Sequence, residues 1–359
     1  MPSLSDPIKL GGIEAKNRIL MAPLTRGRAT KNHVPTAMMV EYYRQRATAG
    51  LIISEATGIS LQGSGWPYAP GIWTQEQVEA WRAIVDAVHS TGGKMISQLW
   101  HMGRVNHSNF PGRGQPVSAS ATTAPGLAHT YEGKVPYEQA RPLRIDEIPD
   151  IIEDYKRGAR NALAAGFDGV QIHGANGYLI DQFLRNGTNL REDEYGGSIE
   201  NRIRLLEEVT KGVVSEVGAE LTSVRLSPNG DRQGVNDSNP QPLFVAATAA
   251  LDKIGIAFLE IREPDFNGTN GKADHPPIGP HMRKVFSNPF VVNADYDRAK
   301  GQAAIDNSEA DAISFGRKFI TNPDLPRRLL EDIPLNPSDD NTLWYGGGAQ
   351  GYIDYPFAA

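Results

Sequence analysis

Cysteine is absent from the 359 residues of the chain. This absence excludes disulfide bonds, thiolate zinc sites and cysteine-ligated iron–sulfur clusters. It also excludes a cysteine nucleophile. Any redox chemistry would therefore depend on a bound organic cofactor.

Long apolar runs are missing as well, and no stretch reaches the length of a membrane span. Residues 1–10 hold one lysine and two prolines where a secretory signal would have an apolar core. The remaining composition, 40% hydrophobic and 22% charged, is typical of a globular protein. We expect a protein that does not cross a bilayer and that resides in the cytoplasm.

Basic residues are fewer than acidic residues. The chain has 36 lysines and arginines against 42 aspartates and glutamates, for a formal net charge of −6. The basic residues are scattered along the sequence and form no cluster. A nucleic-acid partner is therefore not expected.

Short β-branched runs alternate with longer amphipathic stretches along most of the chain, which is typical of repeated βα units. The predicted strands are residues 18–24, 51–56, 95–100, 169–174, 223–227, 258–262, 290–294 and 312–317. The predicted helices between them include 75–90, 145–165, 199–217 and 242–254. The strands are nearly continuous in apolar residues, as expected for parallel strands that are covered on both faces.

Eight βα units favour an α/β fold of the closed (β/α)8 TIM-barrel type over an open doubly wound sheet. We expect one domain spanning residues 1–359. Two segments fall outside the repeat. Residues 101–144 are too long for a simple connection and predict a hairpin-bearing excursion within the barrel, after strand 3. Residues 336–359 are rich in aromatic side chains and predict an ordered tail packed on the barrel.

Chemistry in such barrels takes place at the carboxyl ends of the strands. The most informative group follows the fourth strand and consists of His173, Asn176 and Tyr178. A histidine and an asparagine can both donate to a carbonyl oxygen, and a nearby phenol can deliver a proton. The alternative is structural: His173 would cap the strand through backbone hydrogen bonds, and Tyr178 would pack under the next helix.

Two further polar residues stand in otherwise apolar strands. Arg225 would be buried in the fifth strand, where a guanidinium needs an anion or carbonyl partner. That partner is either a ligand or a barrel carboxylate such as Glu55. Gln98, in the third strand, would bind either an amide edge of a cofactor or a neighbouring backbone group.

The loops after the seventh and eighth strands predict a phosphate site, because barrels often hold phosphate there. Asn293 and Ala294 end the seventh strand, and Gly316 and Arg317 end the eighth. Glycine permits close backbone approach, and arginine offers a planar fork for phosphate oxygens. The alternative for this Gly-Arg pair is an ordinary surface turn.

Several long motifs in order resemble the old yellow enzyme family from about residue 7 to residue 356. They are MAPLTR at 21–26, QLWHMGR at 98–104, HGANGYL at 173–179, REDEYGGSIENR at 191–202 and GYIDYP at 351–356. The resemblance implies a barrel that binds FMN and is reduced by NADPH or NADH. Thr25 and Trp100 are similar to the classical branch of the family.

The resemblance also implies a set of cofactor-binding residues. Pro23, Leu24 and Thr25 would line the flavin, with the Thr25 hydroxyl on a ring carbonyl. The other implied contacts are Ala56 and Gln98 at the polar edge, Arg225 at the pyrimidine side, which is negative in the reduced ring, and Asn293, Ala294, Gly316 and Arg317 at the ribityl phosphate.

For the substrate, the resemblance implies that His173 and Asn176 bind an electron-withdrawing oxygen and that Tyr178 supplies a proton. The residues implied to shape the pocket are Trp66, Tyr68, Trp100 and Tyr345. The implied activity is NAD(P)H-dependent reduction of an activated C=C bond in enones, enals, nitroalkenes or maleimides. Hydride would reach the β-carbon from the flavin, and the proton would reach the α-carbon from the opposite face. No metal is implied, and the chain is expected to be a monomer or a homodimer.

The sequence departs from the family pattern at three points. Trp66 is followed by Pro67 and Tyr68 where relatives tend to have a tyrosine, so either ring can face the substrate. The seventh-strand loop, with Asp295 after Ala294, is less rich in glycine than usual. Trp344 precedes Tyr345 where phenylalanine is common.

Two other classes of function compete with this interpretation. An aldolase-like barrel would need a lysine on an inner strand for Schiff-base chemistry, and none lies in the predicted strand segments. A metal-dependent barrel would need clustered ligands, but His101, His173 and Glu55 form no recognisable motif. A small-molecule binding protein without catalysis is the remaining alternative.

Overall fold

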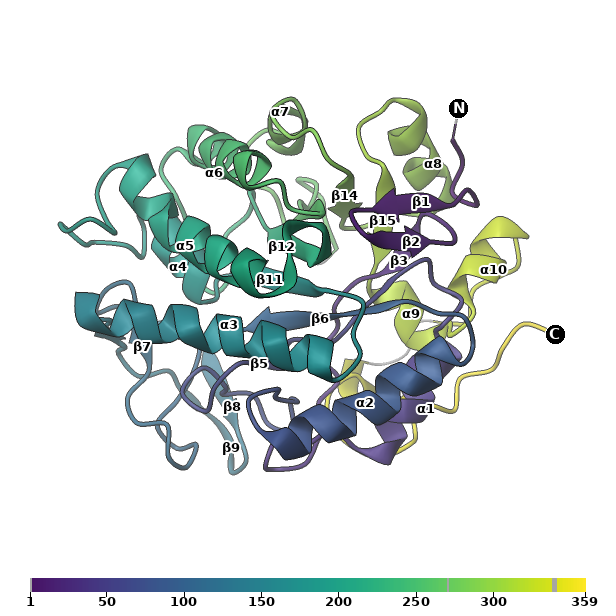
Figure 1. Ribbon diagram of the computed structural model, residues 1–359, viewed down its shortest axis with the longest axis horizontal. Coiled ribbons are helices and arrows are strands. Elements are labelled where there is room, and N and C mark those ends of the chain that lie inside the picture. The colour runs from purple at the N-terminus through teal and green to yellow at the C-terminus, as the bar shows by residue number, and fades with distance from the viewer. Residues whose placement is uncertain (1, 270, 338–340) are drawn as a thin grey trace.

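The structure is a computed structural model that describes residues 2–269, 271–337 and 341–359. In these ranges, eight parallel strands form a closed barrel surrounded by helices (Figure 1). The barrel strands are β3 (Ile19–Met21), β4 (Ile52–Ile53), β6 (Met95–Trp100), β11 (Val170–Gly174), β12 (Thr222–Leu226), β13 (Phe258–Arg262), β14 (Phe290–Asn293) and β15 (Ala312–Phe315). Closure comes from the pairing of β15 with β3 and of β6 with β11. The predicted TIM barrel is therefore confirmed, with each strand inside or within one residue of its predicted segment.

Helices cover the outside of the barrel because the strands are apolar on both faces. They are α1 (Ala37–Gln45), α2 (Gln75–His89), α3 (Ile148–Ala164), α4 (Leu179–Leu184), α5 (Ile199–Val217), α6 (Pro240–Ile254), α7 (Gly279–Arg283), α8 (Arg298–Asp306), α9 (Arg317–Thr321) and α10 (Leu325–Leu330). Ser198 caps α5, with its hydroxyl accepting from the Asn201 N–H at 3.3 Å.

The first two barrel strands are shorter than predicted. Strand β3 stops before Pro23, which has no N–H to donate to the ladder. Strand β4 stops before Glu55, whose N–H donates to the Tyr43 hydroxyl at 2.9 Å instead of to a neighbouring strand. Pairing with β6 resumes at β5 (Thr57–Gly58). The interruption frees residues 54–56 at the carboxyl end of the barrel to serve other roles.

An antiparallel hairpin of β1 (Ile8–Leu10) and β2 (Ile13–Ala15) packs against the amino-terminal end of the barrel. Leu10, Ile13 and Ala15 are buried together with residues that open the barrel strands, such as Leu51 and Phe258. This apolar cluster fills the amino-terminal end of the barrel interior. Among the described residues, the carboxyl end is therefore the end that is open to a ligand.

The excursion after β6 contains β7 (Val117–Ser118), β8 (Leu127–Thr130), β9 (Gly133–Pro136) and β10 (Arg141–Pro142). Strands β8 and β9 form an antiparallel hairpin that projects below the barrel in Figure 1. The short 3₁₀ turns of the chain are η1 (Ile145–Glu147), η2 (Ala219–Leu221) and η3 (Asn341–Leu343).

The carboxyl-terminal tail packs on the barrel as predicted. Tyr352 is fully buried, and its ring stacks on that of Tyr42 at 4.2 Å between centroids. Arg26 donates to the carbonyls of Trp344 at 2.7 Å and of Gly351 at 2.7 Å. These contacts hold the tail beside the carboxyl end of β3. Residues 338–340 of the predicted tail lie outside the described residues.

None of the helices in the described ranges has both the length and the apolar character needed to span a membrane.

Candidate active site

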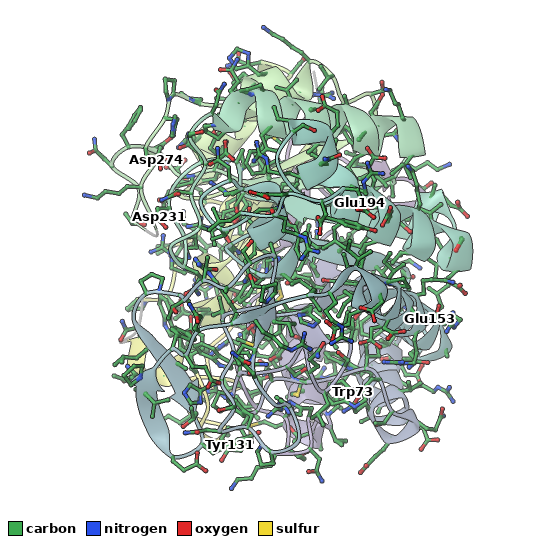
Figure 2. All side chains as sticks on the ribbon, turned by 90° about the vertical axis from the view of Figure 1, so that its left-hand side faces the viewer. Trp73, Tyr131, Glu153, Glu194, Asp231 and Asp274 are labelled. Carbon is green, nitrogen blue, oxygen red and sulfur yellow. The ribbon has the colours of Figure 1, made fainter. Side chains whose placement is uncertain are left out.

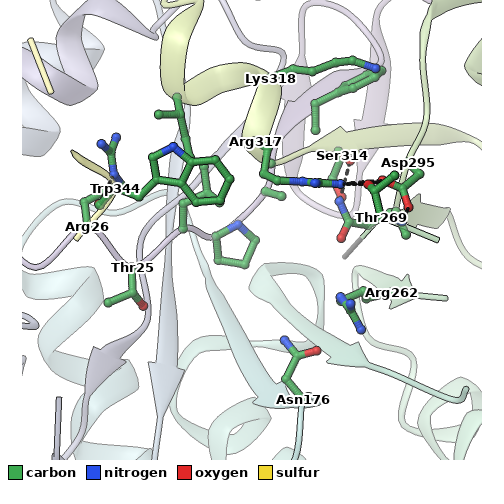
Figure 3. A pocket seen from close by; sticks show the side chains of 18 of the residues that line it. Thr25, Arg26, Asn176, Arg262, Thr269, Asp295, Ser314, Arg317, Lys318 and Trp344 are labelled. Atoms are coloured by element: carbon green, nitrogen blue, oxygen red, sulfur yellow. Dashed lines mark hydrogen bonds and ion pairs between the residues drawn. The ribbon is translucent and has the colours of Figure 1, made fainter. Parts of the chain in front are cut away.

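A cavity of about 760 Å³ opens at the carboxyl ends of the barrel strands (Figure 3). Its volume lies in the range of small-molecule and cofactor sites, roughly 300–1,000 Å³. Most of the residues predicted for the site line this cavity. They are Pro23, Leu24, Thr25, Trp66, Trp100, Asn176, Tyr178, Arg225, Asn293, Ala294, Gly316, Arg317 and Tyr345.

Four predicted residues do not line the cavity. Tyr68 is exposed and meets Tyr131 edge-on at 5.2 Å, so Trp66 is the aromatic side chain of this loop that faces the cavity. Ala56 is buried in an apolar cluster with Trp100. Gln98 lies inside the barrel, and His173 lies just behind the cavity wall, with its ring 5.0 Å from that of Tyr178.

Asn176 and Tyr178 are placed by the turn between β11 and α4. Asn176 has a positive φ of 59° and donates its N–H to the Ser227 hydroxyl at 2.8 Å. Asparagine tolerates this left-handed conformation better than most residues do. Its side-chain oxygen Oδ1 is buried and has no hydrogen-bond partner among the described residues. A buried polar atom without a partner at a cavity is typical of a ligand site.

His173 is set up as a neutral hydrogen-bond donor. Burial, and secondarily the charge of Arg225, hold the pKa of its imidazole well below the usual value. The Ala175 N–H donates to Nδ1 at 3.4 Å, which places the proton of the neutral ring on Nε2. Nε2–H is then the donor that His173 can offer to a ligand.

Tyr178 is held as a protonated phenol. Burial is the main reason that its pKa lies above the usual range for tyrosine. Its ring meets those of Trp100 and His173 edge-on, each at 5.0 Å between centroids. The phenol therefore has a fixed position and a proton to give at neutral pH.

A carboxylate anchors Arg225 beneath the cavity. A barrel carboxylate was one of the two partners that the sequence analysis allowed, the other being a ligand. That carboxylate is Glu260, at 3.0 Å, and not Glu55. A second bond runs from Nη2 to the Asn293 side-chain oxygen at 2.8 Å, whereas Nε is buried and has no hydrogen-bond partner in the part of the chain that the structure describes. The ion pair is thus compatible with a ligand contact at Nε.

Gln98 belongs to the same polar network inside the barrel. Its amide donates to Gln171 at 2.7 Å, and Gln171 donates to Glu260 at 2.9 Å. Ser314 also donates to Glu260, at 2.5 Å. The network fixes the orientation of Arg225 from below, since Gln171 and Ser314 hold the Glu260 carboxylate with which Arg225 pairs.

Glu55 performs a separate supporting role at the β3–α1 loop. Its carboxylate accepts the N–H groups of Arg26 at 3.2 Å and Gly27 at 3.3 Å, and the Tyr43 hydroxyl at 3.2 Å. Burial raises the pKa of the Glu55 carboxyl to about 7, against the lowering effect of those donors. The carboxyl therefore holds in place the loop that carries Thr25.

The corner predicted to bind phosphate contains an internal ion pair. Arg317 extends across the cavity to Asp295 at 2.5 Å, and it also contacts Thr269 (Figure 3). Ala294 and Asp295 both have positive φ values, 130° and 50°, a region that favours glycine. The loop is thus strained where a cofactor phosphate would sit.

The cavity is also lined by residues to which the sequence analysis assigned no role, among them Arg232, Arg262, Lys318 and Trp344. Arg262 ends the sixth barrel strand, Arg232 follows the fifth, Lys318 follows Arg317, and Trp344 belongs to the tail. A charged residue at the end of a barrel strand was a usable signal for Arg262. For Trp344, the sequence held no signal of a place at the cavity, because its position depends on the hydrogen bonds from Arg26 and Arg28 to the tail carbonyls.

The residues present fit FMN. The buried Nε of Arg225 has no hydrogen-bond partner among the described residues, and Arg225 lines the cavity. Arg317 and Lys318 place two cations in the corner formed by the last two strands. Barrel and cavity together define a TIM-barrel enzyme whose site is suited to a phosphate-bearing redox cofactor.

Comparison with known proteins gives the family. Residues 3–336 match the model of the NADH:flavin oxidoreductase / NADH oxidase family. The chain belongs to this family, which includes the old yellow enzymes, and is an NAD(P)H-dependent flavin oxidoreductase with FMN as its cofactor.

Individual relatives are similar over nearly their full length. The chain is 44% identical to 12-oxophytodienoate reductase 1 of Oryza sativa subsp. japonica, over 99% of this chain and 93% of the relative. It is 40% identical to 12-oxophytodienoate reductase 2 of Arabidopsis thaliana, over 98% and 95%.

Among solved structures, the old yellow enzyme homologue from Zymomonas mobilis is 60% identical, with a TM-score of 0.97 over 99% of both chains. Morphinone reductase in complex with tetrahydroNAD is 43% identical, with a TM-score of 0.94 over 100% of this chain and 98% of that one.

Proposed function

We propose that the protein is an ene-reductase that uses NADPH or NADH to reduce the C=C bond of enones, enals, nitroalkenes or maleimides. One observation carries this proposal. The side chains suited to gripping and protonating a substrate, Asn176 and Tyr178, line the same cavity as the cofactor-side cations Arg225 and Arg317. Cofactor and alkene can therefore meet in one place.

The cofactor would be held along one side of the cavity. Pro23, Leu24 and Thr25 would lie against the ring, and Arg225 would donate from Nε to its pyrimidine side. The ribityl phosphate would be held by Asn293, Ala294, Gly316 and Arg317. Ala56 and Gln98 act from behind the wall, since neither lines the cavity.

When bound, FMN supplies the redox chemistry, taking a hydride from NAD(P)H and passing it to the β-carbon of the alkene. The protein residues make the alkene reactive. His173 Nε2–H and the Asn176 amide donate to the electron-withdrawing oxygen and draw electron density away from the β-carbon. Tyr178 gives its phenolic proton to the α-carbon from the other face of the alkene. Trp66, Trp100 and Tyr345 shape the space around the alkene.

The names of the relatives agree with this chemistry, because they denote reductases of 12-oxophytodienoate and of morphinone. This agreement supports the reaction class, and the substrate of the present chain is proposed only as an activated alkene.

An absorbance spectrum of the purified protein tests the proposal. We expect flavin bands in the visible range, bleaching on anaerobic addition of NADPH, and their return when 2-cyclohexenone is added. A protein that binds FMN and is bleached by NADPH but is not reoxidised by any activated alkene would exclude ene reduction.

A further inference from the structure

The cavity wall carries far more positive than negative charge. In the described ranges, one carboxylate lines it, Asp295, and it pairs with Arg317. The cationic lining residues are Arg26, Arg225, Arg232, Arg262, Arg317 and Lys318. The cofactor phosphate and the flavin pyrimidine account for charge near Arg317, Lys318 and Arg225, and Arg26 is engaged with the tail.

These roles do not include two of the lining cations, Arg232 and Arg262. Arg232 lies in the loop after β12, and a Cβ at Gly177 would come within 2.5 Å of its carbonyl oxygen. The loop therefore packs directly on the turn that carries Asn176 and Tyr178. The guanidinium lines the cavity, is half-buried, and has neither a hydrogen bond nor an ion pair within the described residues.

The adjacent carboxylate, Asp231, does not neutralise Arg232. Figure 2 shows Asp231 at the edge of the molecule, close to Asp274. The two loops are joined there by the Gly230 N–H, which donates to Asp274 at 2.9 Å. Asp231 is exposed, and its negative charge acts on Arg104, where it partly offsets the lowering of the Arg104 pKa by burial. The positive charge of Arg232 is thus directed at the cavity.

The field of Arg232 reaches both the reacting group and a second arginine. Its charge counters the burial that raises the Tyr178 pKa. Burial, followed by the charge of Arg232, lowers the pKa of Arg262 to about 9. Figure 3 places Arg262 between Asn176 and the Asp295–Arg317 pair. Two guanidiniums in a partly buried wall repel each other unless an anion lies between them.

We propose that Arg232, supported by Arg262, forms an anion subsite that binds a carboxylate carried by the substrate, so that the enzyme acts preferentially on activated alkenes with a second, anionic group. This inference rests on the proposed ene-reductase function. A planar guanidinium beside the Asn176–Tyr178 turn can bind a carboxylate through two parallel hydrogen bonds while the oxygen at the other end of the molecule is held by His173 and Asn176. The charged group would orient the alkene before hydride transfer.

The test uses a matched pair of enals, 4-carboxycinnamaldehyde and its methyl ester. The holoenzyme is reduced anaerobically by light, with EDTA as the electron donor in place of nicotinamide, and the second-order rate of flavin reoxidation is measured for each compound. We expect the acid to react about tenfold faster than the ester, the size of one charge-assisted contact. Arg232→Gln should bring this ratio close to one, and Arg232→Lys should keep part of it. Arg82→Gln, which removes an exposed arginine on α2, is the control and should leave the ratio unchanged.

Two results would overturn the subsite. One is an acid-to-ester ratio that is the same in the wild type and in Arg232→Gln. The other is a loss confined to the reductive half-reaction, in which Arg232→Gln slows flavin reduction by NADPH but not by NADH. That result would assign the arginine to a phosphate of the reductant.

Failure of the proposed function is distinguishable from failure of the subsite. If neither enal reoxidises the flavin, ene reduction is excluded, and binding still tests the subsite. The dissociation constant of 4-carboxycinnamaldehyde for the oxidised holoenzyme, measured by calorimetry, should be about tenfold larger in Arg232→Gln than in the wild type. Equal constants would contradict the inference.

Discussion

The residues proposed to polarise and protonate the substrate depend on their protonation states. His173 is kept neutral by burial and by Arg225, and Tyr178 is kept protonated by burial. Burial lowers the pKa of the His173 imidazole and raises the pKa of the Tyr178 phenol, so both groups are uncharged at neutral pH. Donation to the substrate oxygen and delivery of the proton are therefore both available at neutral pH.

Replacing Tyr178 with phenylalanine should separate the two half-reactions. The phenyl ring keeps the packing on Trp100 and His173 but has no proton to give. We expect flavin reduction by NADPH to stay within about twofold and reoxidation by 2-cyclohexenone to slow by about 10²- to 10⁴-fold. Anaerobic stopped-flow absorbance measures both rates, and equal slowing of the two would show a structural role for the phenol.

Asp295 is expected to weaken FMN binding. It occupies Arg317 with a carboxylate at the position proposed for the phosphate. Asp295→Asn removes this charge but keeps a residue that tolerates the positive φ. We expect the affinity of the apoprotein for FMN to rise by about three- to tenfold, because like charges at short distance disfavour binding.

Quenching of FMN fluorescence by the apoprotein measures this affinity. Arg317→Gln serves as the opposite control and should weaken binding. Weaker binding in Asp295→Asn would instead show that the carboxylate supports the cofactor site through its bonds to Thr269.

Most of the residues of the site were predictable from the sequence, and the exceptions have physical causes. Short motifs at strand ends predicted Thr25, Asn176 and Arg317. The sequence alone did not decide whether Trp66 or Tyr68 faces the cavity. In the structure, the positive φ of Tyr68 directs its ring outward to Tyr131. The sequence also suggested Glu55 as the partner of Arg225. The true partner, Glu260, lies opposite Arg225 through the register of β12 and β13, and local sequence does not predict the register between strands.

At the scale of elements, the interruption of β4 supports the site. Glu55 leaves the ladder and holds the β3–α1 loop through the N–H groups of Arg26 and Gly27. Arg26 in turn holds the tail that carries Trp344 and Tyr345. One carboxyl thus connects the loop that carries Thr25 to the part of the cavity wall that holds Trp344 and Tyr345.

This carboxyl should make stability depend on pH. Glu55 has a pKa of about 7 in the folded protein and 4.5 as its ordinary value. The folded state therefore binds more protons between these values, and its stability falls as the pH rises from about 4.5 to 7. The full effect is about 3 kcal/mol, from 1.36 kcal/mol per pKa unit.

Glu55→Gln should remove most of this pH dependence while keeping an oxygen that accepts both N–H groups. Urea midpoints at pH 5, 6, 7 and 8 measure it for the wild type and the variant. Glu79→Gln, an exposed change on α2, is the matched control and should follow the wild type. Parallel curves for the wild type and Glu55→Gln would contradict a raised Glu55 pKa.

Element types were easier to predict than element lengths. Hydrophobic runs located all eight barrel strands and the long helices, because burial on both faces leaves a clear signal. The short helices α7, α9 and α10 have too few residues for a periodic pattern, and their positions depend on tertiary contacts. The break after β4 depends on the Tyr43 hydroxyl, which lies far from it in sequence.

At the scale of the whole molecule, the barrel is filled at its amino-terminal end and open at its carboxyl end. This asymmetry follows from the fold and was predictable once eight βα units were recognised. The division into one domain, the monomeric or dimeric state and the cytoplasmic location stay predictions.

Cofactor binding should stabilise the entire barrel. FMN would contact side chains from at least four barrel strands, so it binds the folded state only. At FMN concentrations about 100 times its dissociation constant, the stabilisation is about 2.7 kcal/mol. We expect the melting temperature of the apoprotein to rise by a few degrees on adding FMN, measured by differential scanning calorimetry. Riboflavin, which lacks the phosphate, is the control and should give a smaller shift.

The most direct test of the account is the position of deuterium in one product. 2-Methyl-2-cyclohexenone, at saturating concentration, is reduced with NADPH that carries deuterium at its transferable position, and the product is examined by NMR. The account predicts deuterium at the β-carbon, on the face opposite to the hydrogen added at the α-carbon, because we propose that Tyr178 and the cofactor act from opposite sides of the alkene. Deuterium on the same face as the new α-hydrogen, or none at the β-carbon, would contradict it.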